Sequence, residues 1–307
     1  MPASTYGRRF TRHENVQLAA GARAAPGLVG YIGLLSDLTT INPNDSVPGG
    51  WNATWDTNNL IVSANNVVID HYKINAPVIF EGTNPTITNC IVTASQNDLF
   101  VITHQGFNKG FLTVTDCTTI GNYNHTTFAQ QVDGISSDSG LIARRCDVYG
   151  TGDGIHPVPQ PGSYATGSIV SQCYVHDQAF VDESQHCDGM QWFSHQSSTG
   201  FLTVEHCYIA KTVSTIGTPL NSALTCMPNS DTISPLCVVK IDNNFFASGL
   251  YHLRMGNRAS NCVVTNNDFG PLDTAGGEFG LYDYVNTADI ITWSNNRDYL
   301  GNQISFP

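Results

Sequence analysis

The feature that most constrains this chain is a short segment that recurs nine times between Val67 and Asp298, at intervals of 18 to 37 residues. In each copy an apolar residue is followed by two polar residues and then by one further residue, which is a cysteine or an asparagine in eight of the copies. A repeat of this period indicates a solenoid or a related array. The residues of this last column are Tyr72, Cys90, Cys117, Cys146, Cys173, Cys207, Asn244, Asn267 and Asn296.

The polar pair decides between architectures. A plain strand alternates inward and outward side chains, so two consecutive polar residues at a fixed place indicate a bend between two short strands. Nine copies of strand, corner and strand predict an all-β fold, a single-stranded, right-handed parallel β-helix of about nine or more coils, each coil burying its apolar columns on its neighbours. A sandwich or a barrel also has short strands, but neither explains a polar pair at the same register nine times. The pairs run from Asp70-His71 to Ser294-Asn295.

Residues 1–60 do not follow the repeat, and we expect them to form an N-terminal arm and a cap or lead-in over the first coil. Residues 61–307 then form one β-helix domain. The five cysteines of the repeat column are expected to be small buried thiols. Cys226 and Cys237 bracket a loop and would form a disulfide only in an oxidising setting.

Net charge and segment lengths exclude several partners. A formal charge of -12 disfavours nucleic acid, which needs a basic surface to displace counterions, and it disfavours anionic membranes. The apolar stretch from Gly27 to Leu35 is too short for a membrane span, and no small-residue cleavage site follows it. We therefore expect no membrane insertion, no nucleic-acid binding and synthesis in a cytosol.

Four segments of the chain carry a family resemblance. The runs WNATWDTNNLIVSANNVVIDHYKI, SQCYVHD, HCDGMQ and IDNNFF resemble those of right-handed β-helix proteins of the pectate-lyase-like fold found in actinobacteria and in the tails of their phages. The resemblance covers roughly residue 51 to the end. It implies a polysaccharide or cell-surface glycan as the partner, a virion tail location with other tail proteins, and a homotrimer. Because fold alone does not name a reaction, the activity has to come from the site.

Three Asp-Gly steps on consecutive coils are the candidate site. Asp133, Asp153 and Asp188 are each followed by glycine and then by isoleucine or methionine, so alignment of the coils would stack three carboxylates on one face. Carboxylates held that close raise one another's pKa and can divide acid and base roles, as glycoside hydrolysis requires. The layout is similar to that of the polygalacturonase group, to which Asp133 and Asp153 correspond by position. The group's Gly-His-Gly motif, its double aspartate and its Arg-Ile-Lys motif are absent here.

The alternative for each Asp-Gly step is a turn, because Asp and Gly both favour turn conformations. Neighbouring side chains favour chemistry: His156 and His186 join the three aspartates as candidate catalytic residues. No zinc spacing is present, and no metal is assigned; calcium held by the three aspartates is the polysaccharide-lyase version of the site, with Arg254 or Lys211 as the base. We rank hydrolase above lyase. The candidate substrate-binding residues are Gln191, Trp192, His195 and Arg254.

Two functions from different classes follow. The first is an enzyme, a tailspike-like or minor tail protein that depolymerises a bacterial surface polysaccharide. The second is a structural and receptor-binding tail component that recognises such a glycan without cutting it. A virion protein assembled in the host cytosol needs no export signal, which favours the phage tail, and a secreted lyase or glycosidase is the remaining alternative.

Overall fold

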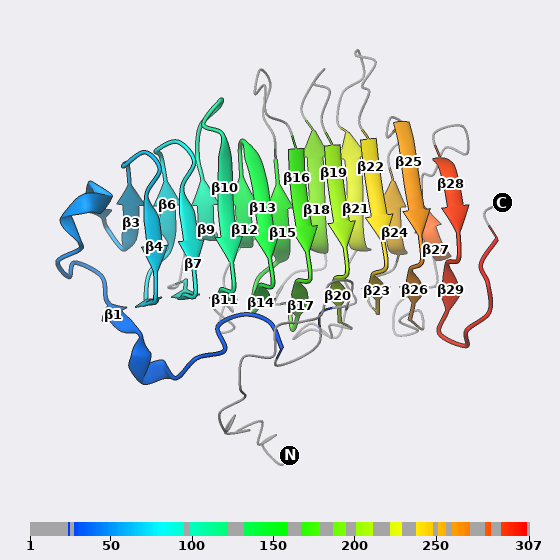
Figure 1. Cartoon of the computed structure of the whole chain (residues 1–307), viewed down its shortest axis with the longest axis horizontal. Helices are drawn as coiled ribbons and strands as arrows, with labels where there is room; N and C mark the ends of the chain where they lie inside the picture. The colour runs from blue at the N-terminus through cyan, green and yellow to red at the C-terminus, as the bar shows by residue number, and fades with distance from the viewer. Residues whose placement is uncertain are drawn as a thin grey trace.

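The computed structural model describes residues 24, 28–94, 99–121, 132–158, 167–178, 187–194, 201–210, 222–228, 238–247, 251–255, 260–270, 280–283 and 290–305. Three long sheets run along a rod, with the strands across its axis (Figure 1). Two short 3₁₀ helices, η1 (Leu35–Asp37) and η2 (Gly49–Trp51), precede most of the strands. No helix within the described ranges is long and apolar enough to cross a membrane.

Each sheet is a stack of short strands drawn from successive coils. Sheet A has ten strands: β1 (Thr39–Ile41), β5 (Tyr72–Ile74), β8 (Ile91–Thr93), β11 (Thr118–Ile120), β14 (Asp147–Tyr149), β17 (Tyr174–His176), β20 (Tyr208–Ile209), β23 (Phe245–Phe246), β26 (Asp268–Phe269) and β29 (Arg297–Asp298). Sheet C has nine: β4 (Val68–Asp70), β7 (Thr86–Thr88), β10 (Phe111–Thr115), β13 (Gly140–Arg144), β16 (Gly167–Ser171), β19 (Phe201–Glu205), β22 (Val238–Asp242), β25 (Ser260–Thr265) and β28 (Ile290–Ser294).

Sheet B carries the three Asp-Gly steps. Its ten strands are β2 (Ala53–Asp56), β3 (Asn59–Val62), β6 (Val78–Phe80), β9 (Phe100–His104), β12 (Asp133–Ser137), β15 (Asp153–Pro157), β18 (Asp188–Ser194), β21 (Ser222–Pro228), β24 (Tyr251–Met255) and β27 (Gly280–Asp283). The chain runs from a strand of sheet C through a corner into sheet A, and then into sheet B. Its strands pair in parallel throughout the three described sheets, except that β2 and β3 form an antiparallel hairpin. The predicted parallel β-helix is therefore confirmed, with one strand of sheet C for each of the nine repeats.

The corner lies at the polar pair, as the sequence predicts. The second residue of every pair has a left-handed backbone, with φ between 49° and 62°. Asparagine and aspartate tolerate this conformation, whereas Arg145 needs support. Its N–H donates to the carbonyl of Ser171 at 3.0 Å, and its guanidinium binds both carboxylate oxygens of Asp116 at 2.6 and 2.7 Å. The nine corner residues are His71, Asn89, Asp116, Arg145, Gln172, His206, Asn243, Asn266 and Asn295.

Cysteine and asparagine share the next column because they make equivalent hydrogen bonds. The Sγ of Cys207 donates to the carbonyl of Val170 on the preceding coil at 3.6 Å. The Nδ2 of Asn267 donates to the matching carbonyl of Ile241 at 3.0 Å. Both side chains are fully buried, so each contact satisfies a backbone group that has no access to water. The cysteines of this column are free thiols, and burial raises the pKa of Cys146 and Cys173 well above the ordinary value.

Replacing Asn267 with Ala is expected to lower the free energy of unfolding by roughly 3–5 kcal/mol, because it leaves several buried backbone and amide groups unbonded at about 1–3 kcal/mol each. The Oδ1 of Asn267 accepts two hydrogen bonds from Asn244, one from its backbone N–H at 2.9 Å and one from its side-chain Nδ2–H at 3.0 Å. Asn267→Cys is the matched control, since cysteine fills this column elsewhere. Its loss in the free energy of unfolding should be about half that of Asn267→Ala. Urea unfolding of both variants measures this, and equal losses would contradict the proposed equivalence.

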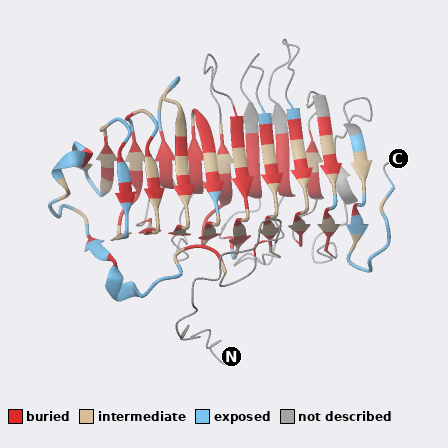
Figure 2. Cartoon of the chain, in the orientation of Figure 1, coloured by how far each residue is buried: buried red, intermediate tan, exposed pale blue. Residues whose placement is uncertain are grey.

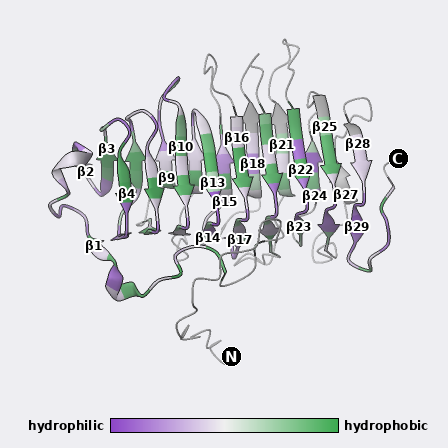
Figure 3. Cartoon of the chain, viewed as in Figure 1, coloured by the Kyte–Doolittle hydropathy of each residue, from purple (hydrophilic) through white to green (hydrophobic). Residues whose placement is uncertain are grey.

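The interior is mainly apolar (Figures 2 and 3), and it is lined by columns of side chains such as Ile87, Val114 and Val264. At the first coil, the buried ring of Trp51 packs edge-on against Tyr72 at 4.9 Å between centroids. Cys226 is a free, buried thiol rather than half of a disulfide, and Cys237 lies outside the described residues.

Candidate active site

The three Asp-Gly aspartates lie side by side at the start of neighbouring strands of sheet B. Asp133 of β12 pairs directly with Asp153 of β15. The pairing of Ile155 with Met190 sets Asp188 of β18 opposite Asp153 in the next coil. The coils therefore bring together three carboxylates that are far apart in the sequence, as their repeated spacing indicates.

None of the three Asp-Gly steps is a turn, because each begins a strand. The glycines are needed for a close approach inside the coil. A Cβ on Gly154 would overlap with the carbonyl oxygen of Gly189 on the next strand and with Cγ1 of Val175 from sheet A. The same overlaps arise at the glycines after Asp133 and Asp188, so interior packing explains why glycine follows each aspartate.

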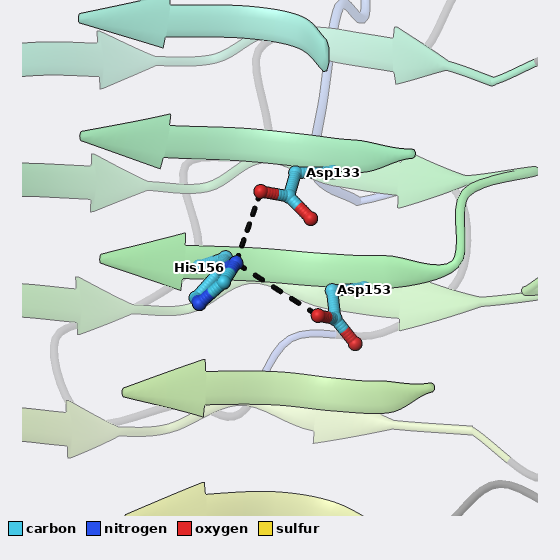
Figure 4. A group of neighbouring side chains, drawn as sticks. All are labelled: Asp133, Asp153 and His156. Atoms are coloured by element: carbon cyan, nitrogen blue, oxygen red, sulfur yellow. Dashed lines mark hydrogen bonds and ion pairs between the residues drawn. The ribbon is translucent and has the colours of Figure 1, made fainter. Parts of the chain in front are cut away.

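His156 lies between two of the carboxylates (Figure 4). Its Nδ1 is 2.9 Å from Oδ2 of Asp133, which is a hydrogen bond, and 3.8 Å from Oδ2 of Asp153. The exposed fraction of the side chain is 16% for His156, 11% for Asp133 and 1% for Asp153. Asp133 and His156 thus reach solvent as a pair, while Asp153 lies behind them.

Burial and charge act in opposite directions at His156. Burial alone would lower the pKa of His156, but the charge of Asp133, the hydrogen bond to it and the charges of Asp153 and Asp188 together raise that pKa to about 9. Burial and the charge of Asp133 raise the pKa of Asp153 well above its ordinary value. Near neutral pH the imidazole of His156 is therefore protonated and can serve as an acid.

Asp188 belongs to a buried hydrogen-bond network and has no exposed surface. Its carboxylate accepts the hydroxyl of Ser222 at 2.6 Å and the amide Nε2–H of Gln191 at 2.9 Å. Its own backbone N–H donates to Oδ1 of Asp153 at 2.7 Å, and Gln178 donates to its carbonyl oxygen at 2.8 Å. Asp188 therefore holds Asp153 in place and does not face the surface.

An open pocket of about 640 Å³ lies against the Asp133–His156 pair. It is formed on the outer face of sheet B, where Thr103 and Ser136 are paired residues of neighbouring strands and their hydroxyls are 2.9 Å apart. Its wall is the segment that links β9 to β10, which is tied down by a hydrogen bond from the N–H of Gly106 to Asp138 at 3.0 Å. The lining residues are Glu81, Phe100, Thr103, Gln105, Gly106, Lys109, Asp133, Ser136, Asp138, His156 and Val158.

The other predicted site residues are spread more widely. Gln191 is buried and bonded to Asp188. Trp192 is a core residue with 1% exposure, so its ring has no face available to a sugar, contrary to the expected stacking. Arg254 follows Gln191 and Thr225 in the same column of sheet B, away from the residues that line the pocket. His186 and His195 lie outside the described residues.

The residues present do not fit the calcium site expected of a lyase. Asp188 is fully buried and both of its carboxylate oxygens accept hydrogen bonds. Among the described residues, the group whose ligand atoms could share an ion consists of Asp133, Asp153 and His156, with those atoms all within 4.8 Å of one another, and Asp188 is not part of it. A set that includes an imidazole suits transition metals better than calcium, which prefers oxygen ligands.

Sequence reasoning missed most of the pocket wall, including Glu81, Phe100, Lys109 and Asp138. Phe100 could have been found from the strand register, because it pairs with Asp133. The other three precede or follow strands and belong to no repeated motif, so the repeat itself contains no signal for them.

Comparisons with known proteins add no evidence on function, so any functional assignment depends on the geometry of this site. The chain matches no protein-family model, no curated protein and no solved structure.

Proposed function

We propose that this protein hydrolyses glycosidic bonds of a bacterial surface polysaccharide at the pocket on sheet B. The observation that carries the proposal is the Asp133–His156 pair, whose 2.9 Å hydrogen bond opens onto a pocket of about 640 Å³. A carboxylate and a protonated imidazole at one pocket supply a stabilising charge and an acid. The outer face of a parallel sheet offers an extended surface along which a polymer can lie.

His156 is the proposed general acid. Because Nε2 of His156 is buried, the imidazolium gives the Nδ1 proton, which it shares with Asp133, to the glycosidic oxygen as the C–O bond breaks. The carboxylate of Asp133 then stabilises the positive charge that develops at the anomeric carbon. Water then adds to that carbon and its released proton returns to His156, so the enzyme ends in its starting state. Asp153 lies 3.8 Å from His156 and does not line the pocket, so it is a positioning residue that helps to orient the imidazole.

The sequence resemblance implies a setting for this function. We propose a tail-associated virion protein, made in the host cytosol and acting as a homotrimer with other tail proteins. Its support is the resemblance of the repeat-bearing segments together with the parallel β-helix fold. A secreted glycosidase of the same fold would use the same residues.

A second candidate function is glycan recognition without cleavage. It is favoured by the burial of two of the three aspartates, since Asp153 and Asp188 are 1% and 0% exposed. Carboxylates that are fully buried and hydrogen-bonded commonly have structural roles. In that case the pocket would bind the glycan and the network would only stiffen sheet B.

Asp133→Asn distinguishes the two functions. Bacterial cell-wall and capsular polysaccharide preparations are incubated with each variant, and released reducing ends and adsorbed protein are both measured. We expect Asp133→Asn to lower release by about 100-fold or more, as loss of a key electrostatic group does, and to leave adsorption nearly unchanged.

Glu205→Gln is the matched control, because it removes a partly exposed carboxylate of sheet C whose partner Lys240 lies at 3.1 Å. Ion pairs at the protein surface contribute little, so release should stay at the wild-type rate. Release by Asp133→Asn at the wild-type rate would contradict the proposed chemistry. If the wild-type protein adsorbs to a preparation but releases reducing ends from none, glycan recognition without cleavage is the function that remains.

A further inference from the structure

We infer that the pocket accepts an uncharged polysaccharide and excludes polymers of acidic sugars. This inference rests on the proposed function and gives its substrate class. It starts from the charges around the pocket, where three carboxylates, those of Glu81, Asp133 and Asp138, face two cations, Lys109 and His156. The count, three negative against two positive charges, leaves the lining acidic in a chain that is itself strongly acidic.

The cations of the lining are outnumbered by carboxylates. The imidazole of His156 is paired with Asp133, which leaves the ammonium of Lys109, bonded to the carbonyl oxygen of Glu81, with the carboxylates of Glu81 and Asp138. A uronate or sulfate group entering the pocket would therefore meet two carboxylates and a single cation. Like charges brought together in a partly desolvated site cost free energy, and they act against such a ligand.

The same carboxylates suit the hydroxyl groups of a neutral sugar. One oxygen of each is held by the protein: Oδ2 of Asp138 accepts the N–H of Gly106 at 3.0 Å, and Oε2 of Glu81 accepts the hydroxyl of Ser63 at 3.0 Å. These bonds fix each carboxylate while its other oxygen can accept a bond from a ligand hydroxyl. Hydrogen bonds to an ionised acceptor are about twice as strong as neutral ones.

Phe100 supplies the apolar part of the site. It lines the pocket and occupies the register position of Asp133 on the preceding coil. An aromatic ring beside hydrogen-bonding groups can pack against the C–H face of a sugar ring while the carboxylates bind its hydroxyls. Beside it, the hydroxyls of Thr103 and Ser136 add uncharged polar contacts on the floor of the pocket.

A glycan array that displays uncharged, uronate-bearing, sialylated and sulfated oligosaccharides, probed with the full-length protein, tests the inference. We expect the bound glycans to be uncharged, with affinities that change less than about twofold between roughly 50 mM and 500 mM NaCl, because no ionic contact is screened. Selective binding of the acidic glycans would overturn the inference, and so would binding of none.

Variants then test the residues against the strongest binder on the array. Asp138→Asn should weaken binding about tenfold, since a bond to a charged acceptor is lost. Lys109→Met should change binding less than about threefold, whereas a tenfold loss on this substitution would point to an anionic ligand. The array reports binding alone, so uncharged glycans that bind and stay intact would refute only the proposed hydrolysis. Cleavage of a uronate polymer would refute only this inference.

Discussion

His156→Gln should lower the rate of glycan cleavage by about 10²- to 10⁴-fold, which is the usual contribution of a general acid. Glutamine keeps a hydrogen-bond donor near Asp133 but cannot release a proton. The wild-type rate should also fall as the pH rises through about 9, because the raised pKa of His156 keeps its imidazole protonated below that value and the proton is lost above it. The residual rate of His156→Gln should show no such fall.

His176→Gln is the matched control for this experiment. His176 lies on sheet A, and burial would lower its pKa, but hydrogen bonds to Asp147 and Asp177 at 2.9 and 2.8 Å and the charges of those aspartates raise that pKa to about 9 as well. It is not among the lining residues of the pocket, so its variant should keep both the rate and the pH profile of the wild type. A full rate in His156→Gln, or the same pH profile in that variant, would show that His156 is not the acid.

Gly154→Ala should strongly destabilise sheet B. The added Cβ would overlap with the carbonyl oxygen of Gly189, a backbone atom of the adjacent strand, and with Cγ1 of Val175 in the core. Gly189 cannot move far without disturbing the pairing of β15 with β18, and Val175 is packed in the core, so we expect a loss of roughly 3 kcal/mol or more in the free energy of unfolding. The shift would also displace Asp153 and His156, which flank the glycine, and lower the cleavage rate.

Gly50→Ala adds the same methyl group where no atom lies within 4 Å, and its unfolding free energy should stay within about 0.5 kcal/mol of the wild type. Thermal and urea unfolding of both variants make the comparison. If the two substitutions cost the same free energy of unfolding, interior packing does not explain why glycine follows each aspartate.

The sequence predicted the fold well because its repeat is tied to backbone geometry. Every corner residue, from His71 to Asn295, has a left-handed φ and a polar side chain. In eight of the nine copies the next residue is a cysteine or an asparagine whose side chain bonds to a backbone carbonyl group. These features recur along the chain, so they leave a pattern that a single sequence displays. Register follows from the same pattern, and it placed Asp133, Asp153 and Asp188 side by side correctly.

The pattern could not show how far each side chain reaches toward solvent. Asp188 has the same motif as Asp133, yet Ser222 and Gln191 enclose its carboxylate. Trp192 directly follows Gln191 and packs into the core. Such differences depend on non-repeating neighbours in adjacent coils. The pocket wall depends on them too, because it comes from the segment between β9 and β10, which has no counterpart among the predicted motifs.

The most direct test of the central claim is the titration of His156 by NMR, with histidine-selective isotope labelling and assignment by its loss in His156→Gln. The paired geometry predicts a pKa of about 9 for His156 and a clear decrease of that pKa in Asp133→Asn, since the carboxylate charge is removed. A pKa near the ordinary value of about 6.5, unchanged in Asp133→Asn, would contradict a charged pair at the pocket and the acid chemistry built on it.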